Sequence, residues 1–511
     1  MTELSHSTQR TGITPRRDED FPEWYQQVIR AAELAEPSDV RGCMVIRPWG
    51  YGIWENMQRQ LDAMFRATGH RNAYFPLFIP LSYFAKEAEH VEGFAKECAV
   101  VTHTRLEVDS DGKMKPASPL TEPLVIRPTS ETIIGASYAR WVQSYRDLPI
   151  LINQWANVVR WEMRPRLFLR TTEFLWQEGH TVHETEAEAR AEARLILDIY
   201  QRFAREHLAL PVFSGEKSES ERFPGAVQTL TIEALVQDRK AIQAGTSHFL
   251  GQNFARASGI QFQNREGKQE FGWTTSWGVS TRLVGTVIMM HGDDDGVVLP
   301  PRIAPVQVVV LPVTPREQTR AKVLEVCDQI AARLCERRYA ELPIEATVDR
   351  RELGGGVKNW EWIKKGVPVR VEIGPRDLEK NSVEVCRRDQ PVKTRESMSM
   401  DEFVARAPEI LSSIQASLYA RAQKFRDANT RTIDSKEDFY NFFTPRNAQK
   451  PEIHGGFALA HWNGSRQVEE QIKNDLKVTI RVIPLDEPAE AGRCIFTGEP
   501  SARRVLWAKS Y

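Results

Sequence analysis

Apolar residues recur at helical spacing in an early segment of the chain. Met57, Leu61 and Phe65 fall on one side of a helix, and Gly69 follows as a residue that commonly ends helices. This pattern predicts an amphipathic helix. The apolar stretch 73–84 after it is strand-like but contains two prolines, which is typical of an edge strand or an interface.

Strands and helices alternate through the middle of the chain. The X-Pro pair in IRPTSE favours an extended residue, so we expect a helix to begin at Thr129 or Ser130. Alternating apolar residues predict a strand over 228–236, and the aromatic and β-branched residues of 271–277 predict another. The polar segment 238–248 between them is predicted to be a loop, and a helix after the second strand is expected to close at HGDDDG.

An α/β pattern follows the proline-rich residues 299–305. The buried-strand run VQVVVLPV precedes a predicted helix over 321–337, strand-like segments over 345–348 and 367–373, and a predicted loop, RRELGGGVKNWEW. A later apolar stripe predicts a long helix, and its members are Leu411, Ile414, Leu418, Ala422 and Phe425.

The length of 511 residues exceeds what one core organises, so the chain should divide into several domains. We expect three, at 1–304, 305–405 and 406–511. A content of 41% hydrophobic and 27% charged residues is ordinary for a globular chain. The sequence has no run of about 18 apolar residues and no apolar secretory segment at its start, which favours a cytoplasmic protein without a membrane partner.

Charge and cysteine usage narrow the chemistry. The 68 Lys and Arg nearly balance the 69 Asp and Glu, so nucleic acid would have to bind at local basic patches. The six cysteines contain no CxxC pair, which argues against a disulfide framework and against a four-thiolate zinc site. We therefore interpret them as reduced thiols.

The stretch from Val158 to His180 carries the most informative charges. Arg160 and Arg170 lie equally far from Pro165, so a hairpin turning there would set the two guanidinium groups across from one another, where they can grip one anion. Glu162 shares the face of Arg160 at strand spacing. A surface hairpin with cross-strand ion pairs fits these residues equally well when they are taken alone.

The sequence contains no GxxxxGK[ST] loop, so a nucleotide would have to be held by arginines. Short polar groups in otherwise apolar segments can line a small pocket, and these are Thr129, Glu131, Gln243, Thr246 and His248. Each of them also fits an ordinary role as a helix cap or a hydrogen-bonded turn residue.

Arg282 stands where a predicted strand gives way to a predicted helix. Its guanidinium can stack on a flat base there. The alternative interpretation is that Arg282 is an ordinary surface arginine. His291 precedes Asp293, Asp294 and Asp295, but consecutive aspartates in an Asp-Gly turn do not converge easily on one cation. We therefore expect a solvated turn there.

Taken in order, several segments resemble the prolyl-tRNA synthetases, specifically the archaeal and eukaryotic-like type, over essentially the whole chain. They are RPTSET, VVRWE…FLRTTEFLWQEGH, QAGTSHFLGQNF and WTTSWGVSTR ahead of HGDDDGVVLPPRIAP. The resemblance implies an α/β (α+β) fold with a class II antiparallel-sheet catalytic core, an α/β anticodon-binding domain and a small α/β C-terminal domain. The arginine hairpin corresponds to motif 2, TTSWGVSTR to motif 3, and the early helix with its proline-broken strand to motif 1, which builds the dimer interface.

The resemblance also implies roles for individual residues, with Arg160, Arg170 and Arg282 as the catalytic arginines. The residues implied for ATP are Arg160, Glu162, Arg170, Thr171, Gln243, Thr246, Ser280 and Arg282, with Gln243 also near Mg²⁺. The residues implied for proline are Thr129, Glu131, Arg160 and His248, with Phe174, Trp176 and Phe223 as apolar walls. The implied activity is ATP-dependent formation of prolyl-adenylate and its transfer to the 3′ end of proline-specific tRNA by a homodimer.

The sequence differs from many relatives in two ways, which concern an editing domain and a zinc site. On the order of sixty residues separate His180 from Gln243, too few for the editing domain that bacterial-type relatives insert there. Because a hydrophobic pocket separates near-isosteres by only about 1 to 3 kcal/mol, we expect detectable activation of cysteine or alanine. The C-terminal region retains only Cys494, with His454 and His461 as remote candidates, so we expect no structural zinc.

The unit 305–405 resembles the class IIa anticodon-binding domain. Its residues Arg351, Lys358, Trp360, Glu361 and Lys364 mix charge with an aromatic ring that can stack on an unpaired base, or they form an amphipathic helix surface. The chain ends in WAKSY, similar to a terminal tyrosine that packs back toward the catalytic domain in the family, but the sequence alone does not place Tyr511.

Two other classes of protein are alternatives to this enzyme. A catalytically inactive RNA-binding or regulatory paralogue would be expected to lack one of the ATP-contacting arginines, and Arg160, Arg170 and Arg282 are all present. A threonyl or glycyl synthetase is disfavoured by the pocket residues and by the absence of a zinc ligand set from the core sequence.

Overall fold

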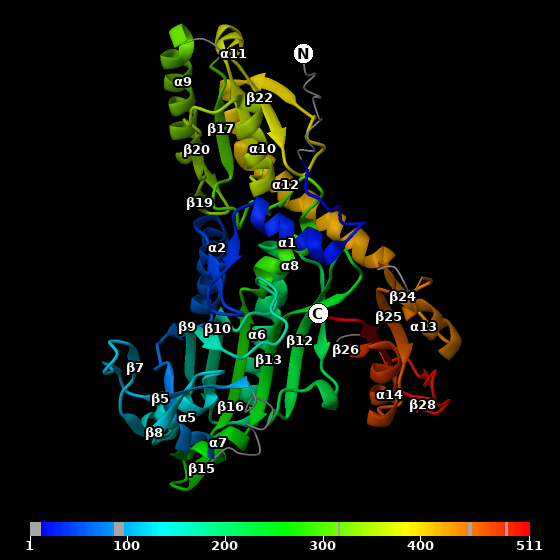
Figure 1. The fold of residues 1–511 in the computed structure, drawn as a ribbon. Coiled ribbons are helices and arrows are strands. Elements are labelled where there is room, and N and C mark those ends of the chain that lie inside the picture. Colours follow the sequence, from blue (N-terminus) through cyan, green and yellow to red (C-terminus); the bar gives the residue numbers. More distant parts are fainter. Residues whose placement is uncertain (1–11, 86–96, 315–316, 448–451, 486–488) are drawn as a thin grey trace.

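The computed structural model describes residues 12–85, 97–314, 317–447, 452–485 and 489–511. A large sheet with its helices forms the centre of the molecule, an α/β domain lies above it, and a smaller unit extends from one side (Figure 1). Within these ranges, no helix combines the length and the apolar character needed to cross a membrane.

The central sheet is antiparallel, as the expected fold class requires. Its strands follow the order β11-β12-β13-β16-β10-β9, and β3 joins β9 in parallel at one edge. Their bounds are β3 (Arg71–Asn72), β9 (Ile150–Val159), β10 (Glu173–His183), β11 (Val212–Glu216), β12 (Gln228–Leu235), β13 (Ala241–Gly251) and β16 (Trp273–Ser280). In the middle of β10, Gly179 leaves room for the ring of Trp277, with which any larger side chain would collide.

Helix α6 (Glu186–Glu206) packs on five strands of this sheet. It begins with a reciprocal capping box between Thr185 and Glu188, and its buried stripe includes Ile196 and Tyr200. Helix α2 (Pro48–Ala67) packs on α6 and on α8 (Arg282–His291). The predicted early helix is confirmed, since Met57, Leu61 and Phe65 are buried along α2.

A smaller layer flanks the β9 edge (Figure 1). The predicted helix after IRPTSE is α5, which begins at Glu131 directly after Ser130. The elements of this layer are β4 (Phe78–Pro80), α3 (Leu81–Ala85), β5 (Ala99–His103), β6 (Leu106–Val108), β7 (Met114–Pro116), β8 (Pro119–Ile126), α5 (Glu131–Trp141), η2 (Tyr145–Asp147), α7 (Asn253–Ser258), β14 (Gln261–Gln263) and β15 (Gln269–Phe271). The N-terminal elements are α1 (Phe21–Ala31), β1 (Ala35–Pro37) and β2 (Met44–Ile46).

The α/β domain has a five-stranded sheet in the order β20-β17-β21-β22-β23. Strands β20, β17 and β21 are parallel, and β22 and β23 are antiparallel to their neighbours. Its elements are β17 (Val308–Pro312), α9 (Glu317–Cys335), β18 (Arg338–Tyr339), β19 (Leu342–Pro343), β20 (Ala346–Val348), α10 (Gly355–Lys365), β21 (Val369–Ile373), α11 (Pro375–Lys380), β22 (Ser382–Arg387), β23 (Glu396–Ser399) and α12 (Met400–Ala428). Helix α12 contains the predicted apolar stripe and runs continuously through residues 405 and 406.

The C-terminal unit extends the central sheet. Strand β26 (Thr479–Pro484) pairs with β11, so that β24-β25-β29-β26 and the central strands form one sheet of eleven strands. The remaining elements are β24 (Thr430–Thr432), α13 (Lys436–Phe443), β25 (Phe457–His461), α14 (Arg466–Leu476), β27 (Gly492–Arg493), β28 (Pro500–Ser501) and β29 (Arg504–Ala508).

Two predicted loops are wrong. Residues 238–248 fall mainly on β13, which is buried on both faces and therefore shows no simple alternation of apolar and polar residues. The segment RRELGGGVKNWEW contributes most of α10, although this helix begins with glycines. The helix is stabilised by packing of the buried Ile363 and by the hydrogen bond from Trp362 to Asp349.

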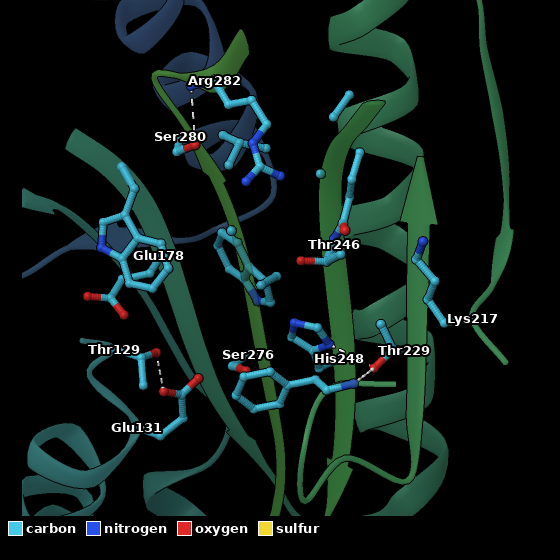
Figure 2. A pocket seen from close by; sticks show the side chains of 18 of the residues that line it. Thr129, Glu131, Glu178, Lys217, Thr229, Thr246, His248, Ser276, Ser280 and Arg282 are labelled. Carbon is cyan, nitrogen blue, oxygen red and sulfur yellow. Dashed lines mark hydrogen bonds between the residues drawn. The ribbon is translucent and has the colours of Figure 1, made fainter. Parts of the chain in front are cut away.

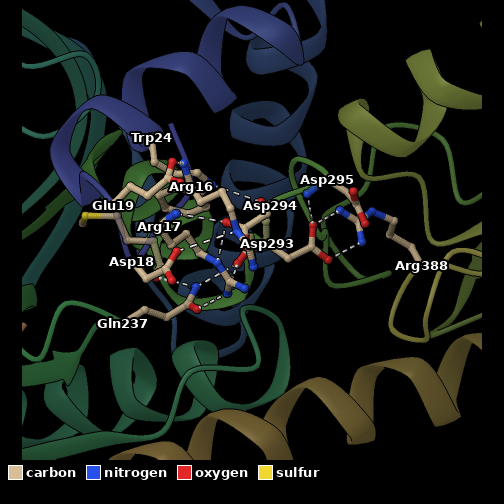
Figure 3. Close-up of polar contacts among 12 residues, drawn as sticks. Arg16, Arg17, Asp18, Glu19, Trp24, Gln237, Asp293, Asp294, Asp295 and Arg388 are labelled. Atoms are coloured by element: carbon tan, nitrogen blue, oxygen red, sulfur yellow. Dashed lines mark hydrogen bonds and ion pairs between the residues drawn. The ribbon is translucent and has the colours of Figure 1, made fainter. Parts of the chain in front are cut away.

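The acidic turn after α8 is not simply solvated, contrary to the sequence interpretation. Both oxygens of Asp293 accept from Arg388, at 2.5 and 2.6 Å, and Asp294 accepts from Arg17 at 3.2 Å (Figure 3). Although burial alone raises the pKa of Asp293, its hydrogen bonds and ion pair with Arg388 lower it on balance. The turn therefore fastens the central sheet to the α/β domain.

Candidate active site

A cavity of about 360 Å³ opens over the middle of the central sheet (Figure 2). Its lining comes from β10, β13 and β16, from the entries to α5 and α8, and from the loop after β11. Of the predicted site residues, those lining the cavity are Thr129, Glu131, Arg160, Phe174, Trp176, Phe223, Gln243, Thr246, His248, Ser280 and Arg282. Glu162, Arg170 and Thr171 do not line it.

One end of the cavity is acidic and aromatic. Thr129 donates a hydrogen bond to the buried carboxylate of Glu131. Arg160 donates from Nε to the carbonyl of Pro128 at 2.8 Å and lies 5.5 Å from the ring centre of Trp176. Burial lowers the pKa of Arg160, and the charge of Glu131 opposes that shift. A carboxylate and a guanidinium thus face one small space that can hold both charges of an amino acid.

A buried charge pair that the sequence interpretation missed lies beside this end. Glu178 pairs with Nε2 of His180 at 3.0 Å and also accepts hydrogen bonds from Ser130 and Gln154. Burial raises the pKa of Glu178, but its contacts, led by His180, lower it on balance; the same pair raises the pKa of His180 against burial. The spacing of Glu178 and His180 on one face of a strand was a signal that could have found them.

His248 closes the same end without carrying charge. Burial, helped by the positive charge of His180, lowers its pKa to about 3. The ring of Phe223 stacks on it at 4.6 Å, and Thr229 Oγ1 lies 3.0 Å from its Nδ1. In the described part of the chain, the buried hydroxyl of Ser276 has no hydrogen-bond partner and is available to a ligand.

The other end of the cavity is basic. Arg282 begins α8 and donates from Nε to the carbonyl of Leu169 at 3.2 Å, and its backbone N–H donates to Ser280 Oγ at 3.2 Å. Burial, together with the nearby charges of Arg170 and Arg160, lowers the pKa of Arg282 to about 10. Three like charges near a helix N-terminus form a region that an anion stabilises.

The predicted hairpin around Pro165 is wrong in its register. The strands pair Val159 with Glu173, so the backbone N–H of Arg160 donates to Thr172 rather than facing Arg170. Between them, Leu167 to Leu169 are buried, and Tyr25 donates to the carbonyl of Leu167 at 2.8 Å. This apolar anchoring displaces the turn and leaves Arg170 exposed at the edge of the basic end.

The other two residues outside the cavity are engaged within the same connection. Glu162 accepts from the backbone N–H of Arg164 at 2.8 Å, and Thr171 donates to the carbonyl of Glu173 at 2.7 Å.

The terminal tyrosine packs on the turn between β12 and β13. Its hydroxyl donates to Asp238 at 2.6 Å, and its backbone N–H donates to the carbonyl of Ala241 at 3.1 Å. Ala241 in turn donates to Lys509 at 2.8 Å. The C-terminus therefore holds the start of β13, the strand that carries Gln243 and Thr246 into the cavity.

Some of the candidate RNA-contacting residues of the α/β domain make contacts within the domain itself. Arg351 bonds Asp349 at 2.7 Å and Glu361 at 2.5 Å, and the buried Lys358 donates to the carbonyl of Asp349 at 3.2 Å. Trp360 and Lys364 are half-buried on α10. Among the described residues, no three His, Cys, Asp or Glu side chains converge as a metal site, in the C-terminal unit or elsewhere.

Comparison with known proteins agrees with this architecture. Residues 113–291 match the class II tRNA synthetase core domain (G, H, P, S and T), 307–410 match the anticodon binding domain, and 448–511 match the C-terminal domain of prolyl-tRNA synthetase. Proline–tRNA ligase 2 of Anaeromyxobacter dehalogenans is 61% identical, covering 99% of this chain and 100% of that protein. Proline–tRNA ligases of Protochlamydia amoebophila and Akkermansia muciniphila are each 57% identical over the same shares. The chain therefore belongs to the prolyl-tRNA synthetase family of class II aminoacyl-tRNA synthetases.

Proposed function

We propose that this enzyme, an ATP-dependent proline–tRNA ligase, binds proline at the Glu131 end of the cavity and ATP at the Arg282 end. The observation that carries this assignment is that one continuous cavity joins an acidic, aromatic end to a basic end, with Arg160 in its lining. The secondary ammonium of proline pairs with Glu131, and its ring contacts Phe174, Trp176 and Phe223. Thr129 and His248 complete this end.

The reaction needs charge neutralisation and alignment more than a general base. The proline carboxylate attacks the α-phosphorus in line, and Arg160 touches both groups. Arg282 and Arg170 hold the remaining phosphate charge, and Glu162, Thr171, Thr246 and Ser280 complete the ATP contacts. The terminal ribose hydroxyl of tRNA then attacks prolyl-adenylate.

Gln243 is the cavity residue that we place near Mg²⁺. Its amide is neutral and half-buried in the lining, so phosphate oxygens of ATP would supply most of the ligands. When bound, the ion neutralises further phosphate charge. We propose no structural zinc, because His454 and His461 already contact Lys509 and Ser501 respectively. Stoichiometric zinc in the purified protein would contradict this proposal.

We propose a homodimer that charges proline-specific tRNA in the cytoplasm. Tyr74, Phe78 and Leu81 are exposed apolar residues on the proline-broken segment assigned to motif 1. In the proposed division, the catalytic domain spans 1–304, the anticodon-binding domain 305–405 and the C-terminal domain 406–511. Arg351, Trp360, Glu361 and Lys364 remain candidates for contact with the anticodon, whereas Lys358 is buried and donates to carbonyl groups inside the domain.

We further propose that the chain is of the archaeal and eukaryotic-like type. Between β10 and β13 it contains α6, β11, η3 (Glu219–Glu221) and β12, which leaves no room for a separate editing domain. The C-terminal unit built on β24 to β29 also supports this type.

ATP–pyrophosphate exchange tests the assignment of the site. Exchange should depend on proline rather than threonine or glycine, and Arg160→Ala should abolish it. Arg140→Ala is the matched control. The Arg140 side chain is exposed, and its described hydrogen bonds go to Ala136 and Ser137 of its own helix, α5. Full proline-dependent exchange by Arg160→Ala would overturn the proposed site without affecting the family assignment.

A further inference from the structure

One wall of the cavity is the loop 217–227, which connects β11 to β12. Lys217, Arg222 and Phe223 of this loop line the cavity, and Phe223 stacks on His248. In the described part of the chain, the buried Nε of Arg222 has no hydrogen-bond partner, so the loop brings an unused donor to the cavity. The shape and polarity of this wall depend on where the loop is held.

The C-terminal unit holds this loop from outside the cavity. Ser218 donates from its buried hydroxyl to Oε1 of Glu469 at 2.6 Å, and Glu469 is itself buried on α14. One helical turn later, Lys473 bonds Oε1 of Glu221 at 3.1 Å. The two contacts come from one face of α14 and reach Ser218, directly before η3, and Glu221, its last residue, next to Arg222 and Phe223.

We infer that Glu469 is a positioning residue for proline: through Ser218 it fixes the loop 217–227, so that Phe223 stands in place before proline binds. Lys473 supports the same loop through Glu221. The inference rests on the proposed placement of proline against Phe223. A loop that is already ordered spares proline the cost of ordering it, and this saving appears as tighter binding. Because ATP is assigned to the opposite end, its binding should depend much less on Glu469.

The buried hydrogen bond between Ser218 and Glu469 should hold the loop more strongly than the exposed ion pair between Lys473 and Glu221. Burial raises the pKa of Glu469, while the hydrogen bond from Ser218 opposes the rise. Lys473 is exposed, so its ion pair with Glu221 is screened by water and contributes less. The test therefore centres on Glu469.

The experiment measures ATP–pyrophosphate exchange with the full-length enzyme, varying proline and ATP separately. Glu469→Ala should raise KM for proline about tenfold, which corresponds to about 1.4 kcal/mol, and change KM for ATP less than twofold. Glu469→Gln keeps an oxygen that accepts from Ser218 and should restore most of the proline KM. Glu470→Ala is the matched control, because Glu470 is the exposed neighbour that pairs with Arg466 at 3.1 Å, and it should leave both constants unchanged.

A second readout separates positioning from loss of stability. If Phe223 is displaced, the ratio of kcat/KM for proline to kcat/KM for alanine in exchange should also fall. A smaller fraction of folded enzyme lowers both values equally and leaves this ratio unchanged. Unchanged constants for Glu469→Ala, or equal rises in KM for proline and ATP, would overturn the inference. If Glu469→Ala does not fold, Ser218→Ala gives the same test from the loop side, with the same expected and contradicting results.

Phe223→Leu distinguishes failure of this inference from failure of the proposed site. If Phe223→Leu leaves KM for proline unchanged, the proposed placement of proline is wrong and the inference falls with it. If Phe223→Leu raises KM for proline while Glu469→Ala does not, the placement stands and only the role of Glu469 is refuted.

Discussion

Glu233 holds two buried cations at the junction of the catalytic sheet and the C-terminal unit. Its side chain is 0% exposed, and it bonds Lys217 at 2.6 Å and Arg481 at 3.0 Å, whose side chains are 3% and 6% exposed. Glu233→Gln keeps the shape and removes the charge, so both cations lose their buried counter-ion. Glu221, 3.8 Å from Arg481, replaces only part of it.

The expected loss follows from this burial. Removing one partner of a buried ion pair costs about 3 to 5 kcal/mol, and the remaining contacts of Arg481 place the loss near the lower value. Burial alone raises the pKa of Glu233, but Arg481 and Lys217 lower it on balance. A lowered carboxyl pKa contributes stability that is full above the unfolded value and is lost as pH falls through the folded pKa. Measurements at pH 7 therefore detect the whole effect.

Urea unfolding at pH 7 measures the change in the free energy of unfolding of the C-terminal junction. With a slope of about 1 to 3 kcal/mol per molar urea, a loss of about 3 kcal/mol lowers the midpoint by about 1 M or more. Glu490→Gln is the matched control, since Glu490 is 57% exposed and bonds Arg504 at 3.0 Å, and it should cost less than about 1 kcal/mol. Equal midpoints for the two variants would refute the reasoning.

Three further predictions concern the site and its titration. Arg282→Ala should lower kcat for pyrophosphate exchange by about 10²- to 10³-fold, because it removes a preorganised charge at the phosphate end; an unchanged kcat would contradict its role. Burial is the main reason that the pKa is lowered to about 3 in each of His207, His248 and His291. The free energy of unfolding should therefore fall as pH drops from 6.5 toward 3, by up to about 1.4 kcal/mol per pH unit for each histidine. Urea midpoints that stay constant from pH 6.5 to 4.5 would contradict this. Cysteine or alanine should support detectable exchange, since the cavity wall discriminates by only about 1 to 3 kcal/mol per methylene, and exchange with neither would refute that expectation.

Local patterns of apolar residues predicted some elements correctly. Helix α2 lies where the sequence predicted it, because apolar periodicity directly reports an element with one buried face. Strand β12 also lies where the sequence predicted it, because its apolar residues alternate, although the strand is buried on both faces. The junction between strand and helix at Arg282 was also predicted. Eleven predicted site residues line one cavity, but their selection came from resemblance to a family, since polar residues alone did not distinguish ligands from caps.

Elements that depend on distant partners were not predictable in this way. Strand β13 is flanked by β12 and β16 and buried on both faces, so its polar residues resembled a loop until their neighbours were known. The register around Arg160 depends on Tyr25, which holds Leu167 from more than a hundred residues away. The bond from Ser218 to Glu469 is equally non-local. No periodicity encodes such contacts.

The pairing of β26 with β11 gives these non-local contacts a common origin. Without β26, β11 would be an edge strand with unpaired backbone groups, so the C-terminal unit completes the sheet that carries the cavity. Contacts with the catalytic part occur at Glu233, at the loop 217–227 and at the β12–β13 turn beneath Tyr511. All three lie on or next to β12, one strand away from β13, which carries His248 of the proline end as well as Gln243 and Thr246 into the cavity. The C-terminal unit is therefore placed to fix the cavity wall from outside, and its buried polar contacts should matter for proline binding as well as for stability.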